Sequence, residues 1–305
     1  MIQFRKILVP VDFSEPSRKA LTYGLILASQ FKAKLILAHI VPESSALTYA
    51  FPIETFVIER EQRDKSNREI QKLVLAEHAD GLDLQTVVKT GHIDVELLGM
   101  VKDEAIDLVI MGTHGRRYLG RWFIGSVTEH LLRRVPVPVL TVSHVDTERH
   151  AITGDVMLER VLYATDLSDA SSIGMKYATE LARSFGAQLT VVHVVDQLDG
   201  MLWGPGAVTW LEGERVKLVQ EMRKKLAEFV SHEKPSDMKV EALVLEGKPF
   251  ERILEFAQSQ RMDMIVLNLQ SKGILERAFL GSTAERVVRL AQIPVLSIPV
   301  VIAEH

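Results

Sequence analysis

The chain nearly repeats itself, and this duplication constrains its fold more than any other feature. The segment KILVPVDFSEPSRKAL, which starts at Lys6, returns as RVLYATDLSDASSIGM from Arg160, and AKLILAHIV from Ala33 returns as AQLTVVHVV from Ala187. A nearly constant offset of this kind predicts two copies of one domain. The offset is 154 for these segments and 156 for the later landmark pairs, which are Gly91 and Gly247, Asp107 and Asp263, Gly125-Ser126 and Gly281-Ser282, and Pro138 and Pro294.

The length supports the same division, because 305 residues are about twice the usual domain size of roughly 150 residues. We expect the first domain at residues 1–145, a polar linker at 146–158 and the second domain at 159–305. The copies differ after their second strand, where Asp199 to Trp210 of the second copy reads DGMLWGPGAVTW. The Trp residues and Gly-Pro-Gly of this insertion either cover their own domain or form a contact surface.

Each copy alternates short apolar runs with longer segments in which apolar residues have helical spacing. In the first copy the short runs lie at 6–11, 34–41, 84–89, 107–112 and 137–142. They have the length of strands and are rich in Val, Ile and Leu, as strands buried on both faces are. The alternation predicts an α/β fold of two tandem, open-twisted, five-stranded parallel sheets with helices on both faces, as in Rossmann-like proteins.

The composition excludes several classes of function. A net charge of -4 and a pI near 6.2 argue against nucleic acid and anionic membranes as partners. The absence of cysteine excludes disulfides, thiolate nucleophiles and cysteine-bound zinc. The chain starts without a signal-peptide pattern, and no apolar run approaches the roughly 18 residues that span a bilayer. We therefore expect a cytoplasmic protein.

The segment GTHGRRYLGRWFIGS lies between the fourth apolar run and a helical stretch. In an open doubly wound sheet, ligands bind beyond the carboxyl ends of the strands, where the strand order reverses. Gly112 and Gly115 allow the backbone to approach an oxygen-rich ligand closely. Gly125-Ser126 stands where the N–H groups of a helix start attract anions. The loop adds the positive charges of Arg116, Arg117 and Arg121, so the segment is typical of a polyphosphate site.

Each of these positions also has a purely structural interpretation. Ser126 and Glu129 have the spacing of a Ser-x-x-Glu capping box, and Gly112 and Gly115 would suit a bend from strand to loop. Asp12, which ends the first strand, would cap the helix that follows it. Neither the Walker A pattern nor G-x-G-x-x-G occurs in the segment, which excludes two common nucleotide-binding schemes.

The pattern G-x2-G-x9-G-[ST], together with VPVDFS at the end of the first strand, resembles the ATP-binding signature of universal stress proteins. The resemblance covers essentially the whole chain twice. It implies ATP as the cofactor, with Mg²⁺ bound through the phosphates. It also implies that Asp12 lies near the ribose, that the backbone of Ile40 meets the adenine, and that the loop glycines and Gly125-Ser126 hold the ribose and phosphates. The implied nucleotide-binding residues are Pro10, Val11, Asp12, Ile40, Met111, Gly112, His114, Gly115, Arg116, Gly125, Ser126 and Val127.

The second copy departs from this signature. Its loop reads NLQSKGILERAFLGS, with Asn268 and Ser271 in place of the first two glycines and an acidic Glu276 inside the loop. A Cβ at both positions hinders the approach of backbone to phosphate. Gly281-Ser282 and the Ser-x-x-Glu spacing to Glu285 remain. We therefore predict that the first domain binds ATP and that the second has a degenerate site.

The leading hypothesis is a stress-response regulatory protein that binds ATP and hydrolyses it slowly at most. The alternative is a scaffold or dimerisation module that binds no nucleotide. No catalytic residue and no metal ligand is assigned, and His39 and His193 are expected to orient loops or to pack beneath the crevice rather than to bind a metal. The apolar edge strands at 135–142 and 293–300 predict that the two halves pair as an internal pseudo-dimer and that chains associate as a homodimer.

Overall fold

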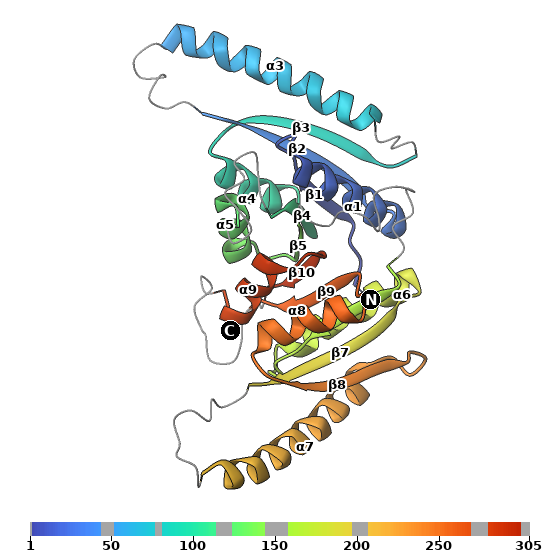
Figure 1. The fold of residues 1–305 in the computed structure, drawn as a ribbon. Helices are drawn as coiled ribbons and strands as arrows, with labels where there is room; N and C mark the ends of the chain where they lie inside the picture. Colours follow the sequence, from blue (N-terminus) through green and yellow to red (C-terminus); the bar gives the residue numbers. More distant parts are fainter. Residues whose placement is uncertain are drawn as a thin grey trace, which may run out of the picture. The chain divides into compact units, whose positions relative to one another are not determined.

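The computed structural model describes residues 2–43, 52–76, 81–113, 124–143, 158–196, 207–269 and 280–299. The chain divides into two compact units, Gln3–Val156 and Met157–His305, whose elements are labelled in Figure 1. The predicted linker at 146–158 lies almost wholly outside the described residues, as does the insertion from Asp199 up to the start of its helix at Ala207.

The first unit alternates strands and helices as the sequence predicts. Its strands are β1 (Lys6–Pro10), β2 (Lys34–Pro42), β3 (Leu84–Gly91), β4 (Leu108–Gly112) and β5 (Val139–Val142). Its described helices are α1 (Glu15–Phe31), α3 (Pro52–Ala76), α4 (Ile93–Asp103) and α5 (Ser126–Arg134).

The second unit repeats this order. Its strands are β6 (Arg160–Ala164), β7 (Gln188–Val195), β8 (Val240–Glu246), β9 (Met264–Asn268) and β10 (Val295–Ile298). Its described helices are α6 (Ser171–Phe185), α7 (Ala207–Glu233), α8 (Pro249–Ser259) and α9 (Ser282–Leu290).

All strand neighbours within each unit are parallel. The order in the first unit is β3-β2-β1-β4-β5, and in the second unit it is β8-β7-β6-β9-β10. The chain therefore runs outward from β1 to β3 and then returns to the other side of β1 at β4. This reversal between β1 and β4 is the topological switch point, and its counterpart lies between β6 and β9. The predicted α/β class and parallel sheets are confirmed.

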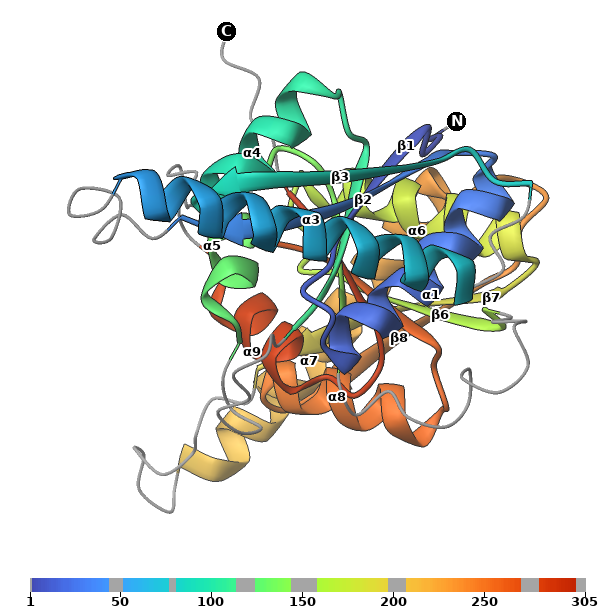
Figure 2. The same ribbon diagram turned by 90° about the horizontal axis from the view of Figure 1, so that it is seen from above.

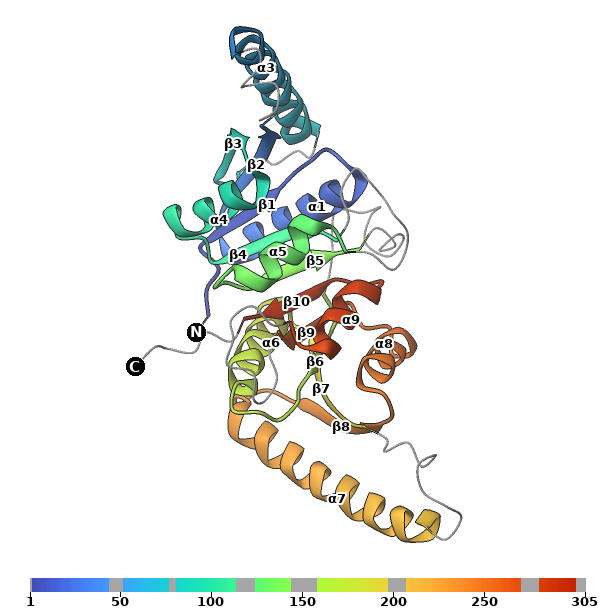
Figure 3. The same cartoon turned by 90° about the vertical axis from the view of Figure 1, so that its left-hand side faces the viewer.

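Right-handed crossovers determine which helices cover which face of each sheet. Since β1, β2 and β3 follow one another in one direction, α1 and α3 cover one face, and the return to β4 and β5 sends α4 and α5 to the other (Figure 3). Figure 2 shows α3 lying along β2 and β3. The second unit repeats the arrangement with α6 and α7 on one face of its sheet and α8 and α9 on the other.

The helix α1 shows how closely the helices pack on the sheet. Its buried residues recur with helical spacing, and they include Ala20, Leu21, Leu27 and Ala28. A Cβ on Gly24 would lie 2.7 Å from the side chain of Val9, so a small residue is needed where this helix crosses β1. The central strands below it are almost entirely buried, which explains their continuous apolar runs.

An aspartate secures the amino end of each sheet, opposite the edge where ligands would bind. Asp107 Oδ2 accepts hydrogen bonds from the backbone amides of Arg5 (2.8 Å) and Lys6 (2.9 Å). Asp263 Oδ2 does the same for Glu159 and Arg160, both at 2.8 Å. These aspartates repeat in the two copies because each one caps the strand that starts its sheet.

We predict that Asp263→Ala exposes the start of β6 to local opening. Asp263 is buried, so its loss leaves two backbone amides without their acceptor and should lower the free energy of unfolding by about 1–3 kcal/mol. Hydrogen–deuterium exchange should accelerate at residues 159 and 160. Asp169→Ala, on the exposed surface of the same unit, is the control. Unchanged exchange in Asp263→Ala would contradict the assignment.

Candidate functional site

The carboxyl ends of β1, β2 and β4 lie side by side in the first unit, because β1 pairs with β2 on one side and with β4 on the other. Pro10 ends β1 and is half-buried, whereas Ile40 in β2 and Met111 in β4 are buried. The structure therefore brings together the parts of the predicted site that come from the strands. His114, Gly115 and Arg116 lie outside the described residues.

The turn that leaves β1 is held by Asp12. Its Oδ1 accepts hydrogen bonds from the backbone amide of Ser14 (3.0 Å) and from the Ser14 hydroxyl. Phe13 between them has a φ of 67°, a left-handed conformation that few residues with a side chain adopt. Asp12 thus stabilises the strained turn into α1, close to the local role that the sequence offered as an alternative.

The second unit builds the same turn. The amide of Ser168 and the hydroxyl of Ser171 donate to Asp166 Oδ1 at 3.0 and 2.9 Å, and Leu167 has a φ of 56°. Strain at one backbone position in both units shows that this turn belongs to the fold itself.

The histidine in the second strand of each unit fixes the chain just after the first strand, as predicted. His39 Nδ1 lies 2.7 Å from the carbonyl oxygen of Val11, and His193 Nδ1 lies 2.9 Å from that of Thr165. Since a carbonyl can only accept, Nδ1 carries the proton in each ring. In the first unit the ring of Phe13 packs against His39 at 4.6 Å between centroids.

The start of α5 is tied to the end of β4. Gly125 is the N-cap residue of α5, and its amide donates to the carbonyl of Thr113 at 2.8 Å. The hydroxyl of Thr128, in the first turn of α5, donates to the carbonyl of Gly112 at 3.0 Å. These bonds close the two ends of the glycine-containing loop. In the second unit the amide of Gly281 closes the corresponding loop on the carbonyl of Leu269 at 2.8 Å.

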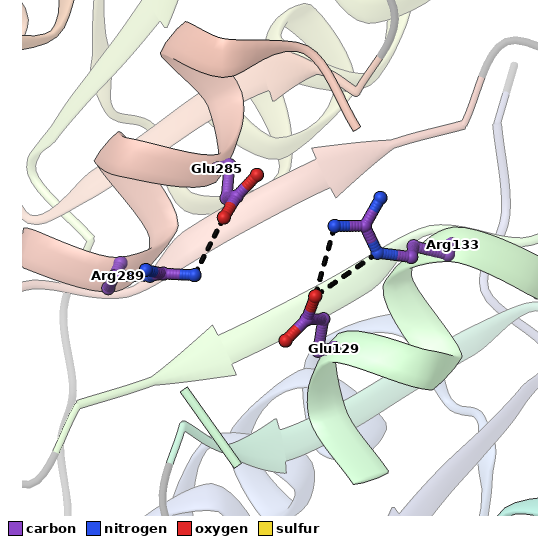
Figure 4. A network of polar contacts seen from close by, with 4 residues as sticks. All are labelled: Glu129, Arg133, Glu285 and Arg289. Atoms are coloured by element: carbon purple, nitrogen blue, oxygen red, sulfur yellow. Dashed lines mark hydrogen bonds and ion pairs between the residues drawn. The ribbon is translucent and has the colours of Figure 1, made fainter. Parts of the chain in front are cut away.

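The predicted capping boxes are wrong in both units. The N-cap is Gly125 rather than Ser126, and its amide is already bonded to Thr113, so Glu129 has no N-cap donor to reach. Glu129 instead forms an ion pair with Arg133 one turn later, at 3.0 Å (Figure 4).

The same correction holds for α9 in the second unit. Gly281 is its N-cap, and Glu285 pairs with Arg289 at 2.6 Å, as Figure 4 also shows. Among the described residues, no side chain caps the start of α5 or α9. Ser126, the first residue of α5, is exposed.

The structure gives Gly112 a role that the sequence does not reveal. A Cβ on Gly112 would lie 2.7 Å from Cβ of Pro16 and 2.9 Å from its carbonyl carbon, so the end of β4 packs directly against the start of α1. The glycine is needed for this contact whether or not a ligand approaches.

In the second unit, a side chain makes the contact between the end of the fourth strand and the start of the first helix. Asn268, in the place of Gly112, donates from Nδ2 to the carbonyl of Ala170 at 3.0 Å. The Tyr163 hydroxyl lies 2.9 Å from Asn268 Oδ1 and 2.7 Å from the carbonyl of Ser171 and shares its proton between them. Burial raises the pKa of Tyr163 well above its usual value, so the hydroxyl stays a donor. Gly174 in α6 leaves room for this network.

The second unit holds a pocket of about 140 Å³ at the carboxyl ends of its strands. Seven of its residues occupy the places of the predicted site residues Pro10, Val11, Asp12, Ile40, Met111, Gly112 and Val127 in the other copy. The pocket is lined by Ala164, Thr165, Asp166, Val192, His193, Val194, Pro249, Ile253, Leu267, Asn268, Thr283 and Ala284.

A second hollow, of about 310 Å³, lies in the first unit where α4 and α5 begin. Ser126 and Val127 of the predicted site line it, together with Glu43, His92 and further residues of β2, β3 and α4. Asp94 and His130, also in its wall, form a 3.2 Å pair between Oδ2 and Nδ1. Two carboxylates in the wall disfavour an anionic group inside this hollow.

These units, each a parallel sheet whose strand order reverses beside its first strand, define a tandem doubly wound α/β protein. The model of the universal stress protein family matches residues 3–143 and again residues 157–299. The chain therefore belongs to the universal stress protein family and carries its domain twice.

Known relatives agree with the duplication. The chain is similar to a universal stress protein of Mycobacterium tuberculosis, with 28% identity over 298 residues and 95% of each chain covered. One of Methanocaldococcus jannaschii is 33% identical over 149 residues, which are 47% of this chain and 83% of that protein. A solved universal stress protein from Archaeoglobus fulgidus has the same fold, with a TM-score of 0.70 at 21% identity, covering 98% of this chain and 99% of that one.

Two kinds of feature are absent from the described residues. No helix there is long and apolar enough to cross a membrane. Within the same residues, no cluster of three or more His, Asp or Glu side chains is arranged to hold a metal ion.

We predict that Gly174 and Asn268 are energetically coupled. In Gly174→Ala the new Cβ would lie 2.7 Å from the Tyr163 hydroxyl and closer still to Asn268 Oδ1, so the unfolding free energy should fall by about 1–3 kcal/mol. Adding Asn268→Gly to the same chain should recover part of this loss, and a double-mutant cycle by thermal unfolding measures it.

Gly213→Ala is the matched control, because no atom of the described residues lies within 4 Å of its added Cβ on α7. It should be neutral or slightly stabilising. Additive effects of Gly174→Ala and Asn268→Gly would contradict the coupling.

Proposed function

We propose that the first unit binds ATP, with Mg²⁺ carried on the phosphates, in the crevice formed by β1, β2, β4 and the start of α5. The observation that supports this best is the start of α5. This helix begins at the switch point, and among the described residues no side chain caps it. The hydroxyl of Thr128 holds its first turn to the end of β4 through the carbonyl of Gly112. Backbone amides at such a helix start favour a phosphate.

The geometry suggests where the base, the ribose and the phosphates of the nucleotide would each lie. The base and ribose would lie over the strand ends, near Ile40 and Asp12, and Ser126 and Val127 would adjoin the phosphates. Because Glu43 and Asp94 line the hollow on the α4 side of Ser126, phosphates are favoured on the other side, toward the loop that carries Gly115 and Arg116.

In this proposal the bound nucleotide acts as a regulatory ligand in a stress response and is hydrolysed slowly at most. Asp12, at the end of the first strand, already holds the turn into α1 through Ser14. A phosphoryl-transfer enzyme needs further groups that position water and stabilise charge. Binding of ATP would order the loop after β4 and so set an interaction surface.

A scaffold that binds no nucleotide is the second candidate, and specific contacts favour it. Gly112 is explained by its packing against Pro16, and Asp12 by its bonds to Ser14. Part of the family signature is thus required by the fold alone. The pairing of the two units as a pseudo-dimer, the association of chains as a homodimer and the cytoplasmic location remain proposals from the sequence.

We predict that Ser126→Asp weakens ATP binding at least about tenfold, a loss of roughly 1.4 kcal/mol. A carboxylate there would repel the phosphates, whereas the same residue suits a helix start, so the fold should be kept. Calorimetric titration with Mg-ATP measures the affinity. Ser282→Asp, at the same place in α9, is the matched control and should bind like the parent chain. Equal affinity in all three proteins would refute the proposed position of the phosphates.

We also predict a stoichiometry of one ATP per chain. The second unit places Asn268 where the first has Gly112, and its loop lacks the other glycine. Titration calorimetry gives the ratio, and denaturation of freshly purified protein releases nucleotide for identification. Two ATP per chain would contradict the asymmetry, and failure of both measurements to detect nucleotide would favour the scaffold.

A further inference from the structure

The pocket of the second unit has dimensions and chemistry of its own. Its volume of about 140 Å³ is close to that of an engineered cavity, about 150 Å³, that accommodates one benzene ring. Most of its wall is apolar, including Val192, Ile253, Leu267 and Ala284. A pocket of this size is suited to a single planar ring.

His193 provides the pocket with a hydrogen-bond acceptor. Its Nδ1 donates to the carbonyl of Thr165 at 2.9 Å, so in the neutral ring Nε2 carries the lone pair. The equivalent His39 is 7% exposed and has the ring of Phe13 packed against it. In the second unit Leu167 replaces Phe13, and His193 is half-buried and lines the pocket. The exchange makes the imidazole accessible in this unit.

The charges of the pocket disfavour phosphate. Asp166, exposed at the wall, is the one Asp, Glu, Lys or Arg side chain among the described lining residues. Both polar atoms of the Asn268 amide are bonded within the protein, to Ala170 and Tyr163. An anion would therefore meet a carboxylate and find no cation among these residues.

From these observations we infer that the second unit binds a neutral, ring-sized aromatic molecule that donates one hydrogen bond to His193 Nε2 and carries no phosphate. The apolar lining, which includes Leu267 and Ile253, would contact the ring, and Thr283 also lines the pocket. This site is independent of the ATP site proposed for the first unit. In this proposal the second unit binds a ligand of another chemical class, although its nucleotide signature is degenerate.

Nuclear magnetic resonance of the full chain tests the proposal, with phenol and cytosine as two sources of a neutral ring that bears a donor. Either or both should bind and shift the ¹⁵N resonance of His193 Nε2 upfield, as accepting a hydrogen bond does. Toluene has the ring without the donor and should bind about fivefold more weakly, the effect of one hydrogen bond of roughly 1 kcal/mol. Phenyl phosphate should not bind.

Two variants separate the pocket from nonspecific binding. Thr283→Phe fills it and should abolish binding, whereas Ser282→Phe adds the same ring at the exposed neighbouring position and should keep it. The inference is overturned if neither ring-bearing probe shifts His193, if phenyl phosphate binds as well as phenol, or if Thr283→Phe binds like the parent chain. ATP titration of the first unit is read separately, so failure of one site does not imply failure of the other.

Discussion

The contact between the start of the first helix and the end of the fourth strand governs the ligand edge of each unit. In the first unit Gly112 lies against Pro16, where no Cβ fits. In the second, Asn268 spans the same contact and donates to the carbonyl of Ala170. Either arrangement fixes the helix that receives the strained turn at Phe13 or Leu167. The choice between them decides whether a side chain stands in the wall of the crevice.

The two copies therefore separate what the fold requires from what a ligand would require. Asp107 and Asp263 recur because each caps the strand that starts its sheet, and Gly125 and Gly281 recur because each begins a helix and closes a loop. The differences gather at the carboxyl ends of the strands. There Asn268 replaces a glycine, and Leu167 stands in the place of Phe13, whose ring packs against His39.

The sequence predicts the architecture well, because buried parallel strands leave continuous apolar runs and the duplication supplies each prediction twice. It predicts the site less completely. The packing of Gly112 against Pro16 joins distant segments, and the capping boxes fail because the amide of Gly125 is taken by Thr113, a bond that depends on the sheet. Tyr163, Gly174 and Asn268 contact one another in the structure. In the aligned copies they are three separate differences, and nothing in the sequence links them. His114, Gly115 and Arg116 stay predictions.

The hydrogen bond from the N-cap glycine to the strand end has an evolutionary consequence. Gly125 and Gly281 join the two ends of their loops in the same way, so each helix start is held to its strand end by a backbone hydrogen bond. A loop whose ends are already fixed changes length and sequence at small entropic cost. The sequences between Thr113 and Gly125 and between Leu269 and Gly281 were therefore able to diverge after the duplication. With the same backbone bond in both copies, one framework can accommodate two different ligands, as the proposed ATP site and the proposed ring site require.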